Sequence, residues 1–214
     1  MGMPYIASIS KIAYNFLKLM QPDQLNRDLS KLKDSLGQLP EAMANPAFVV
    51  VSGLPGTGKT YFCGRLAERQ PFYIIESDAL RKVLFPSPEY SPIESARLFV
   101  VMHRLIEWLL RSGVPVCFDA TNLSEHNREY LYRISDRAGA RLVLVSVEAP
   151  LAVARERLHA RKKRDIPDSK SDADWEIYKQ MKPKAERILR NHFVVDTSHD
   201  ITPVIDKIIH ALNR

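Results

Sequence analysis

Cysteine is scarce in this sequence, with only Cys63 and Cys117 among 214 residues. Two cysteines that lie 54 residues apart give neither a disulfide framework nor the paired spacing of a zinc site. The N-terminal stretch MGMPYIASISK also lacks the basic-then-apolar order of a signal peptide. We therefore expect a cytoplasmic protein in which both thiols are buried.

Long apolar runs are missing as well. The strongest one, residues 98–102, stops at His103, far short of the roughly 18 apolar residues that a membrane-spanning helix needs. Hydrophobic residues make up 45% of the chain and charged residues 26%, a balance that excludes disordered, collagen-like and coiled-coil proteins. The length suits one compact domain with an appendage, and we expect no membrane partner.

Acidic residues are fewer than basic ones, 25 against 31, which gives a net charge of +6. A mildly positive surface field suits an anionic ligand such as a nucleotide, a sugar phosphate or a nucleic acid. The charge does not choose among these ligands, because many metabolic enzymes are equally basic. No protein partner can be inferred from it.

The first 45 residues have the pattern of two helices. Apolar residues recur at three- and four-residue steps in 5–20 and again in 23–36, and Pro22 separates the two stretches. Glycine and proline follow the second stretch, as they often follow a helix C-terminus. We therefore predict a helical hairpin over residues 1–45 that precedes a main domain over residues 46–214.

The main domain alternates short apolar runs with helix-like stretches. The runs are rich in β-branched or aromatic residues and predict five strands, at 47–52, 72–76, 114–119, 141–147 and 193–196. Helices are predicted at 59–69, 79–84, 91–112, 125–139, 151–163, 173–190 and 201–213. This alternation indicates an α/β fold with a five-stranded parallel sheet, covered by helices on both faces.

The segment GLPGTGKT, residues 53–60, fits the pattern G-x-x-x-x-G-K-[ST] at every required position. It follows a predicted strand and opens a predicted helix, which is the context of a phosphate-binding loop. Glycines let the backbone amides surround a phosphate, Lys59 reaches the outer phosphates, and Thr60 offers a hydroxyl to Mg²⁺. The predicted nucleotide-binding residues are Gly53, Pro55, Gly56, Thr57, Gly58, Lys59, Thr60 and Tyr61.

The third predicted strand ends in a lone carboxylate, Asp119, which a place in the magnesium shell explains. The next residue, Ala120, cannot activate a water molecule, as a glutamate does in many ATPases of this type. The sequence also lacks the Asn-Lys-x-Asp element that reads guanine. These features favour transfer of a phosphoryl group to a bound acceptor over its hydrolysis.

Two segments supply candidate acceptor-binding residues. Asp78 and Arg81 follow the second strand, where a carboxylate can accept a proton from an acceptor hydroxyl and a guanidinium can hold an anionic group. Alternatively, Asp78 caps a helix and pairs with Arg81. Asn122 and Arg128 follow the third strand and are further candidates, although Arg128 also suits a solvated helix face.

The basic segment 155–165 predicts a lid. Arg157 and Arg161 are four residues apart on one helix face, ahead of a polar stretch without apolar periodicity. Such arginines can close over a transferring phosphate, and we place the lid at about residues 157–185. A plain solvated helix face is the alternative.

Together, GLPGTGKT, SDALR, VCFDATNLSEHNR and EAPLAVARERLHAR resemble the kinase domain of the polynucleotide 5′-kinases. The resemblance extends to related small P-loop kinases, including zeta-toxin-like and antibiotic-modifying phosphotransferases, and covers about residues 47–198. It implies a P-loop kinase sheet with a lid. By the same resemblance, Asp78 is the general base, Arg81 binds the acceptor phosphate, and Arg157 and Arg161 contact the donor phosphates.

These observations lead us to predict an ATP- and Mg²⁺-dependent kinase that phosphorylates a hydroxyl. The predicted catalytic residues are Lys59, Asp78, Arg157 and Arg161, and the predicted metal ligands are Thr60 and Asp119. A polynucleotide 5′-hydroxyl is one candidate acceptor. Alternatives are a sugar, nucleoside or antibiotic kinase, and a regulator that binds ATP without transferring its phosphate.

Overall fold

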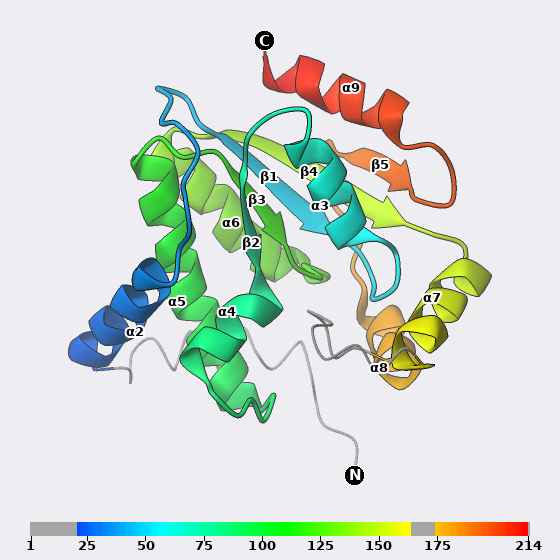
Figure 1. The fold of residues 1–214 in the computed structure, drawn as a ribbon, viewed down its shortest axis with the longest axis horizontal. Coiled ribbons are helices and arrows are strands. Elements are labelled where there is room, and N and C mark those ends of the chain that lie inside the picture. Colours follow the sequence, from blue (N-terminus) through cyan, green and yellow to red (C-terminus); the bar gives the residue numbers. More distant parts are fainter. Residues whose placement is uncertain (1–20, 164–173, 214) are drawn as a thin grey trace.

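A computed structural model of the chain describes residues 21–163 and 174–213. Its centre is a parallel sheet of five strands in the order β2-β3-β1-β4-β5 (Figure 1). The strands are β1 (Ala47–Ser52), β2 (Tyr73–Glu76), β3 (Val116–Asp119), β4 (Arg141–Glu148) and β5 (Phe193–Asp196). The predicted fold class is confirmed, because all five apolar runs form strands of one parallel sheet.

Helices cover both faces of this sheet (Figure 1). They are α2 (Pro22–Asp34), α3 (Lys59–Ala67), α4 (Ser77–Leu84), α5 (Pro92–Arg111), α6 (Glu125–Ala138), α7 (Leu151–Lys163), α8 (Trp175–Met181), the 3₁₀ turn η1 (Lys182–Lys184) and α9 (Thr202–Leu212). Successive side chains of β1 point to opposite faces of the sheet, and each face carries a hydrophobic core. Phe48 and Val50 belong to the larger of the two cores, whereas Val49 belongs to the smaller one.

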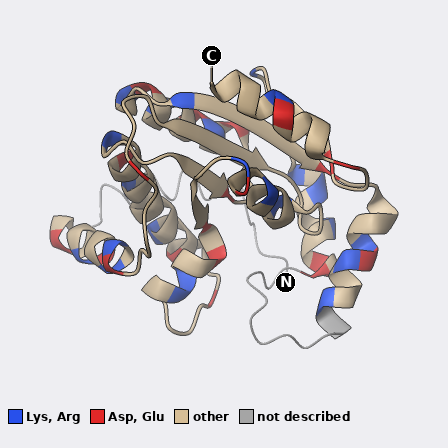
Figure 2. Cartoon of the chain, turned by 45° about the horizontal axis from the view of Figure 1, so that its top comes forward, with Lys and Arg blue, Asp and Glu red and all other residues tan. Residues whose placement is uncertain are grey.

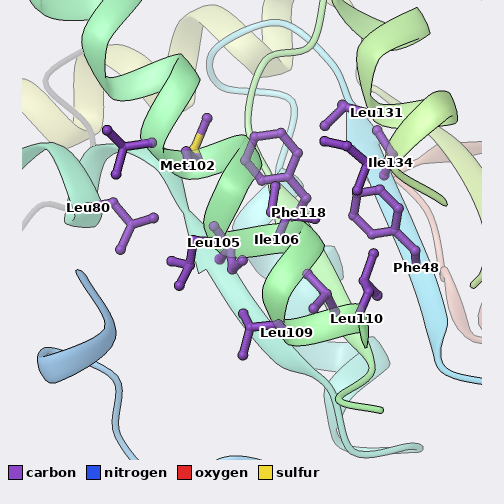
Figure 3. Packing of buried hydrophobic residues seen from close by; sticks show 14 of the residues in the cluster. Phe48, Leu80, Met102, Leu105, Ile106, Leu109, Leu110, Phe118, Leu131 and Ile134 are labelled. Carbon is purple, nitrogen blue, oxygen red and sulfur yellow. The ribbon is translucent and has the colours of Figure 1, made fainter. Parts of the chain in front are cut away.

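The larger core lies between the sheet and helices α2, α5 and α6. Figure 3 shows its centre, where Leu105, Leu109 and other residues of α5 pack near Phe48 and Phe118 of the sheet. The smaller core lies under α3 and α9 and contains both Cys63 and Cys117 as buried free thiols. The position of α5 along the sheet is fixed because its apolar face is buried in the larger core. The first half of α5 reaches the carboxyl edge of the strands.

The helix predicted at 173–190 is shorter than expected. α8 ends at Met181, one 3₁₀ turn follows, and Ala185 is already extended, with φ −72° and ψ 117°. Pro183 has no backbone N–H to continue the helical hydrogen bonds. The chain beyond it bonds elsewhere, because the Glu186 N–H donates to the Leu123 carbonyl at 2.9 Å. A tertiary contact and a proline together override the local helical pattern.

The second helix of the predicted hairpin is present as α2, which packs against α4 and α5. Asp28 of α2 is fully buried and accepts two hydrogen bonds from the Arg97 guanidinium of α5, each 2.6 Å long. The predicted helix at 5–20 and part of the predicted lid, residues 164–173, lie outside the described residues. The division of the chain at residue 45 therefore stays a prediction.

Within residues 21–163 and 174–213, no helix combines the length and the apolar character that crossing a bilayer requires.

Candidate active site

A cavity opens where the carboxyl ends of the central strands meet. The sheet register aligns Asp119 with Val51 of β1 on one side and with Glu76 of β2 on the other, so the loops after three strands lie at one edge. The cavity has a volume of about 1170 Å³. Its volume lies slightly above the roughly 300–1,000 Å³ of ordinary small-ligand pockets.

Most of the residues singled out from the sequence line this cavity. They are Pro55, Gly56, Gly58, Lys59, Thr60, Tyr61, Asp78, Arg81, Asp119, Asn122, Arg157 and Arg161. Gly53, Thr57 and Arg128 do not line it: Gly53 joins β1 to the loop, and Thr57 turns its hydroxyl to the Leu54 carbonyl at 2.9 Å. The fold thus gathers segments that are up to about a hundred residues apart in the chain.

The loop between β1 and α3 is held in a shape that requires glycine. Gly56 and Gly58 have φ angles of 79° and 89°, in the left-handed region that other residues rarely adopt. A Cβ on Gly56 would also lie 2.8 Å from the Ala154 carbonyl oxygen, and one on Gly58 would lie 2.9 Å from Thr197 Oγ1. The loop is therefore packed directly against α7 and against the residue after β5.

Lys59 begins α3 and directs its ammonium back into the loop. Its Nζ donates to the Leu54 carbonyl at 3.1 Å. Desolvation lowers the pKa of Lys59, while the nearby carboxylates of Asp119 and Asp78 raise it. A partly desolvated cation attracts an anion more strongly than one in water does, so this position suits a phosphate ligand.

Thr60 and Asp119, the predicted metal ligands, are in direct contact. Thr60 Oγ1 donates to Asp119 Oδ2 at 2.6 Å and so joins the first turn of α3 to the end of β3. Hydroxyl and carboxylate oxygens are the hard donors that Mg²⁺ prefers. Mg²⁺ at phosphoryl-transfer sites usually keeps several waters and takes phosphate oxygens as well, so two protein ligands fit this ion.

Arg81 lies on α4 in the cavity wall, but its charge is balanced. Its Nη1 donates to Glu94 of α5, and both side chains are buried. The second carboxylate oxygen of Glu94 accepts from the Glu89 N–H at 2.7 Å. The Arg81 Nε–H has no hydrogen-bond partner among the described residues. An ion pair of Arg81 with Asp78 was one predicted alternative, whereas Glu94, which comes from another helix, was not predicted.

Thr197, which the sequence analysis did not single out, links the phosphate-binding loop to α7. Its hydroxyl donates to the Thr57 carbonyl at 2.6 Å and accepts from Arg157 Nη1 at 2.7 Å. Arg157 Nη2 also donates to the Thr197 carbonyl, at 2.9 Å. The sequence feature that could have identified Thr197 is its position directly after β5, at the same edge of the sheet. Arg161, one turn further along α7, also lines the cavity.

Basic residues recur along α7, where they appear blue in Figure 2. Ala154 and Leu158 on another side of this helix pack with Tyr178 of α8 in a small apolar cluster. The Tyr178 ring stacks on Trp175, with ring centroids 4.9 Å apart. α7 and α8 thereby hold each other beside the cavity.

Arg128 does not contact the cavity, which corrects its predicted role in acceptor binding. It is only 1% exposed, and its guanidinium donates to the Glu125 carboxylate and to the carbonyls of Asn122, Glu186 and Arg187. These bonds join the loop after β3 to the segment after η1. Arg128 is a positioning residue for both segments.

Asn122 lines the cavity and also shapes the loop. It adopts a left-handed conformation, with φ 44°, which asparagine tolerates better than most residues. Its Nδ2 donates to the Val51 carbonyl at 2.7 Å, and its own carbonyl accepts from Ser52 Oγ at 3.0 Å. Its contact with an acceptor stays a prediction.

Most of the remaining wall of the cavity was not predicted, although Ser77 was expected beside Asp78 at the carboxyl edge of the strands. It includes polar residues at strand and helix ends and an apolar group, namely Glu76, Ser77, Tyr90, Ser95, Asn127, Gln180, Lys184, Leu98, Phe99, Met102, Phe118, Leu123, Ile177 and Met181. These residues come from strands, helices and loops, and the local sequence pattern of most of them indicated only core or surface. Their common orientation depends on tertiary packing.

Comparison with known proteins agrees with this geometry. A family model described as an AAA domain matches residues 48–188. A search of curated proteins finds no match.

Several solved structures share the fold. The Mycobacterium tuberculosis APS kinase CysC, in complex with AMPPNP and APS, is 18% identical, with a TM-score of 0.58 over 79% of this chain and 99% of its own. Chaetomium thermophilum Kti12, in complex with ADP-AlF3, is 19% identical, with a TM-score of 0.63 over 77% and 98%. A gluconokinase from Sinorhizobium meliloti 1021 is 21% identical, with a TM-score of 0.53 over 79% and 93%. The chain has the fold of small P-loop kinases.

Proposed function

The chain belongs to the AAA domain family, and from this premise we propose that it is a kinase that transfers the γ-phosphoryl group of ATP to an acceptor hydroxyl. The observation that carries the proposal is a single cavity that contains both a phosphate-binding loop and the carboxylate of Asp78. The APS kinase and the gluconokinase among the similar structures support it, because both are named for transfer to a bound acceptor.

The donor end of the cavity would bind the nucleotide. The loop amides and the ammonium of Lys59 would hold the outer phosphates, and Thr60 and Asp119 would hold Mg²⁺. Bound Mg²⁺ would offset negative charge on the phosphates. Arg157 and Arg161 would add positive charge from α7. Kinases depend mainly on such positioning and charge stabilisation.

We call the part of the cavity around Asp78 and Arg81 the acceptor end, and here the Asp78 carboxylate can take up a proton. In the transfer, a bond forms between the acceptor oxygen and the γ-phosphorus, and the bond from that phosphorus to the β,γ-bridging oxygen breaks. The hydroxyl proton passes to the Asp78 carboxylate, and ADP leaves with the bridging oxygen. Ala120 follows Asp119 in the cavity wall and has no group that can polarise a water, which supports transfer over hydrolysis.

Asp78→Asn tests the proposed base. We expect ATP affinity to be unchanged and the single-turnover transfer rate to fall by roughly 10², the usual scale for a positioned proton acceptor. Asp206→Asn is the matched control, because Asp206 is an exposed aspartate on α9. Normal turnover in Asp78→Asn would remove Asp78 from the mechanism.

Asp119→Asn tests the proposed metal site. The amide keeps the size of the side chain and loses its charge, so the Mg²⁺ concentration needed for half-maximal transfer should rise about 10- to 100-fold. Titrating Mg²⁺ against transfer at fixed ATP gives this value. An unchanged Mg²⁺ requirement would show that Asp119 is not a ligand.

The overall proposal is tested by incubating the full-length protein with γ-labelled ATP alone and with a panel of acceptors. The panel contains 5′-hydroxyl oligonucleotides, nucleosides, sugars and antibiotics, because each carries a hydroxyl that this chemistry can phosphorylate. We expect label transfer to at least one of these classes. Tight ATP binding without transfer to any of them would favour a regulator that binds ATP and does not transfer its phosphate.

A further inference from the structure

We propose that the acceptor is an uncharged alcohol with an apolar body. This inference rests on the proposed kinase function and names the substrate class of the same site. It follows from the walls of the acceptor end of the cavity and from the charges that surround them.

The first observation is an apolar wall built from three directions. Leu98 and Met102 are four residues apart on α5 and so project from one face of this helix, and Phe99 lies beside them. Phe118 contributes from β3 and Leu123 from the loop that follows. Met102 and Phe118, both labelled in Figure 3, belong to the larger core and also line the cavity.

α8, which packs against α7, adds two further apolar residues to the cavity lining. Ile177 and Met181 are again four residues apart, and both line the cavity. Phe99, Ile177 and Met181 are partly exposed, so they supply most of the apolar surface that a ligand can cover, and burying it against an apolar ligand is favourable. The other apolar residues of the wall are already buried. A hydroxyl group held against these side chains would lose hydrogen bonds to water that the side chains cannot replace.

The second observation concerns charge. Arg81 lies on α4, three residues from Asp78, and Glu94 already neutralises it. The carboxylates of Glu76 and Asp78 also line the cavity. An anionic acceptor would therefore meet carboxylates beside a guanidinium that is already paired, and burying an uncompensated charge is costly.

The distribution of the other basic residues supports the same conclusion. Lys59, Arg157 and Arg161 surround the phosphate-binding loop, where ATP would use them. Lys184 of η1 also lines the cavity and is exposed, so it keeps its hydration.

The test measures binding and transfer with the full-length protein and Mg²⁺. Calorimetry with a saturating non-hydrolysable ATP analogue compares 2-phenylethanol and 4-tert-butylbenzyl alcohol with glycerol, gluconate and a 5′-hydroxyl oligonucleotide. Transfer from γ-labelled ATP is measured for the same compounds. We expect the apolar alcohols to bind with a negative heat-capacity change and to show at least tenfold higher kcat/KM than the others.

The outcomes separate the inference from the function on which it rests. Transfer to gluconate or to the oligonucleotide with no binding of the apolar alcohols would overturn the inference and leave the kinase proposal intact. Binding of the apolar alcohols without transfer to any compound would support the apolar site and contradict the kinase proposal. Failure of the apolar alcohols both to bind and to accept label would also overturn the inference.

A pair of variants locates the effect in the cavity wall. Met181→Gln places an amide in the wall at nearly constant size, whereas Met43→Gln makes the same change at an exposed position outside the cavity. We expect Met181→Gln to raise KM for the apolar alcohols at least fivefold with little change in KM for ATP. Met43→Gln should change neither, and equal effects of the two variants would overturn the inference. Unfolding temperatures of both variants confirm that they are folded.

Discussion

Replacing Lys59 with methionine is expected to lower the rate of phosphoryl transfer by about 10³, the upper range for removing one charge-stabilising group from an active site. Methionine nearly preserves the length of the side chain and removes its charge. The ammonium lies inside the phosphate-binding loop, 3.1 Å from the Leu54 carbonyl, where desolvation strengthens its attraction for developing negative charge. Single-turnover label transfer to the best acceptor of the panel measures the loss.

Lys207→Met is the matched control for this experiment, because Lys207 is an exposed lysine on α9. It should transfer phosphate at the normal rate. ATP affinity should fall in Lys59→Met as well, but saturating ATP should not restore the rate, since the charge acts in the transition state. A rate within threefold of normal would contradict the assignment of the loop.

Replacing Arg128 with methionine should lower the free energy of unfolding by about 3–5 kcal/mol, the cost of breaking a buried ion pair from one side. Arg128 is 1% exposed and satisfies the Glu125 carboxylate and three backbone carbonyls. Methionine fills much of the same space and satisfies none of them. Urea unfolding of the variant measures the difference.

Two comparisons make the Arg128 result specific. Arg133→Met, at an exposed position of the same helix, should change stability by less than about 0.5 kcal/mol, as surface substitutions usually do. Arg128→Lys should retain the charge but lose the fork of donors that reaches several carbonyls, so we expect intermediate stability. If Arg128→Met lost less than about 1 kcal/mol, the network around Arg128 would contribute little to the fold.

Local patterns were enough to predict the sheet and the phosphate-binding loop. β1 and β5 have the predicted bounds because β-branched runs and the residues that end them act over short distances. The predicted strand ends also indicated which residues would meet the loop at the carboxyl edge, because parallel strands end at the same edge of a sheet. On that reasoning Lys59, Asp78 and Asp119 were expected at one edge of the sheet, and in the structure all three line one cavity.

What sequence reasoning missed depends on contacts between distant segments. Glu94 of α5 neutralises Arg81 of α4. Thr197, directly after β5, donates a hydrogen bond to the Thr57 carbonyl of the phosphate-binding loop. Arg128 looked like a surface or acceptor residue because its partners, the carbonyls of residues 186 and 187, belong to a segment that was predicted to be helical. Once Pro183 ends that helix, those carbonyls become available to a buried guanidinium.

The ion pair between Asp28 and Arg97 bears on where this protein can be cut. The family match begins at residue 48, yet α2 lies before it and holds α5 through a fully buried carboxylate. Leu98, the neighbour of Arg97, belongs to the apolar wall of the cavity. Excising residues 48–188 as a minimal domain would remove the ion pair between Asp28 and Arg97 while leaving the phosphate-binding loop complete. The segment matched by the family model therefore leaves out a helix that packs on α5, the helix from which Leu98 lines the cavity.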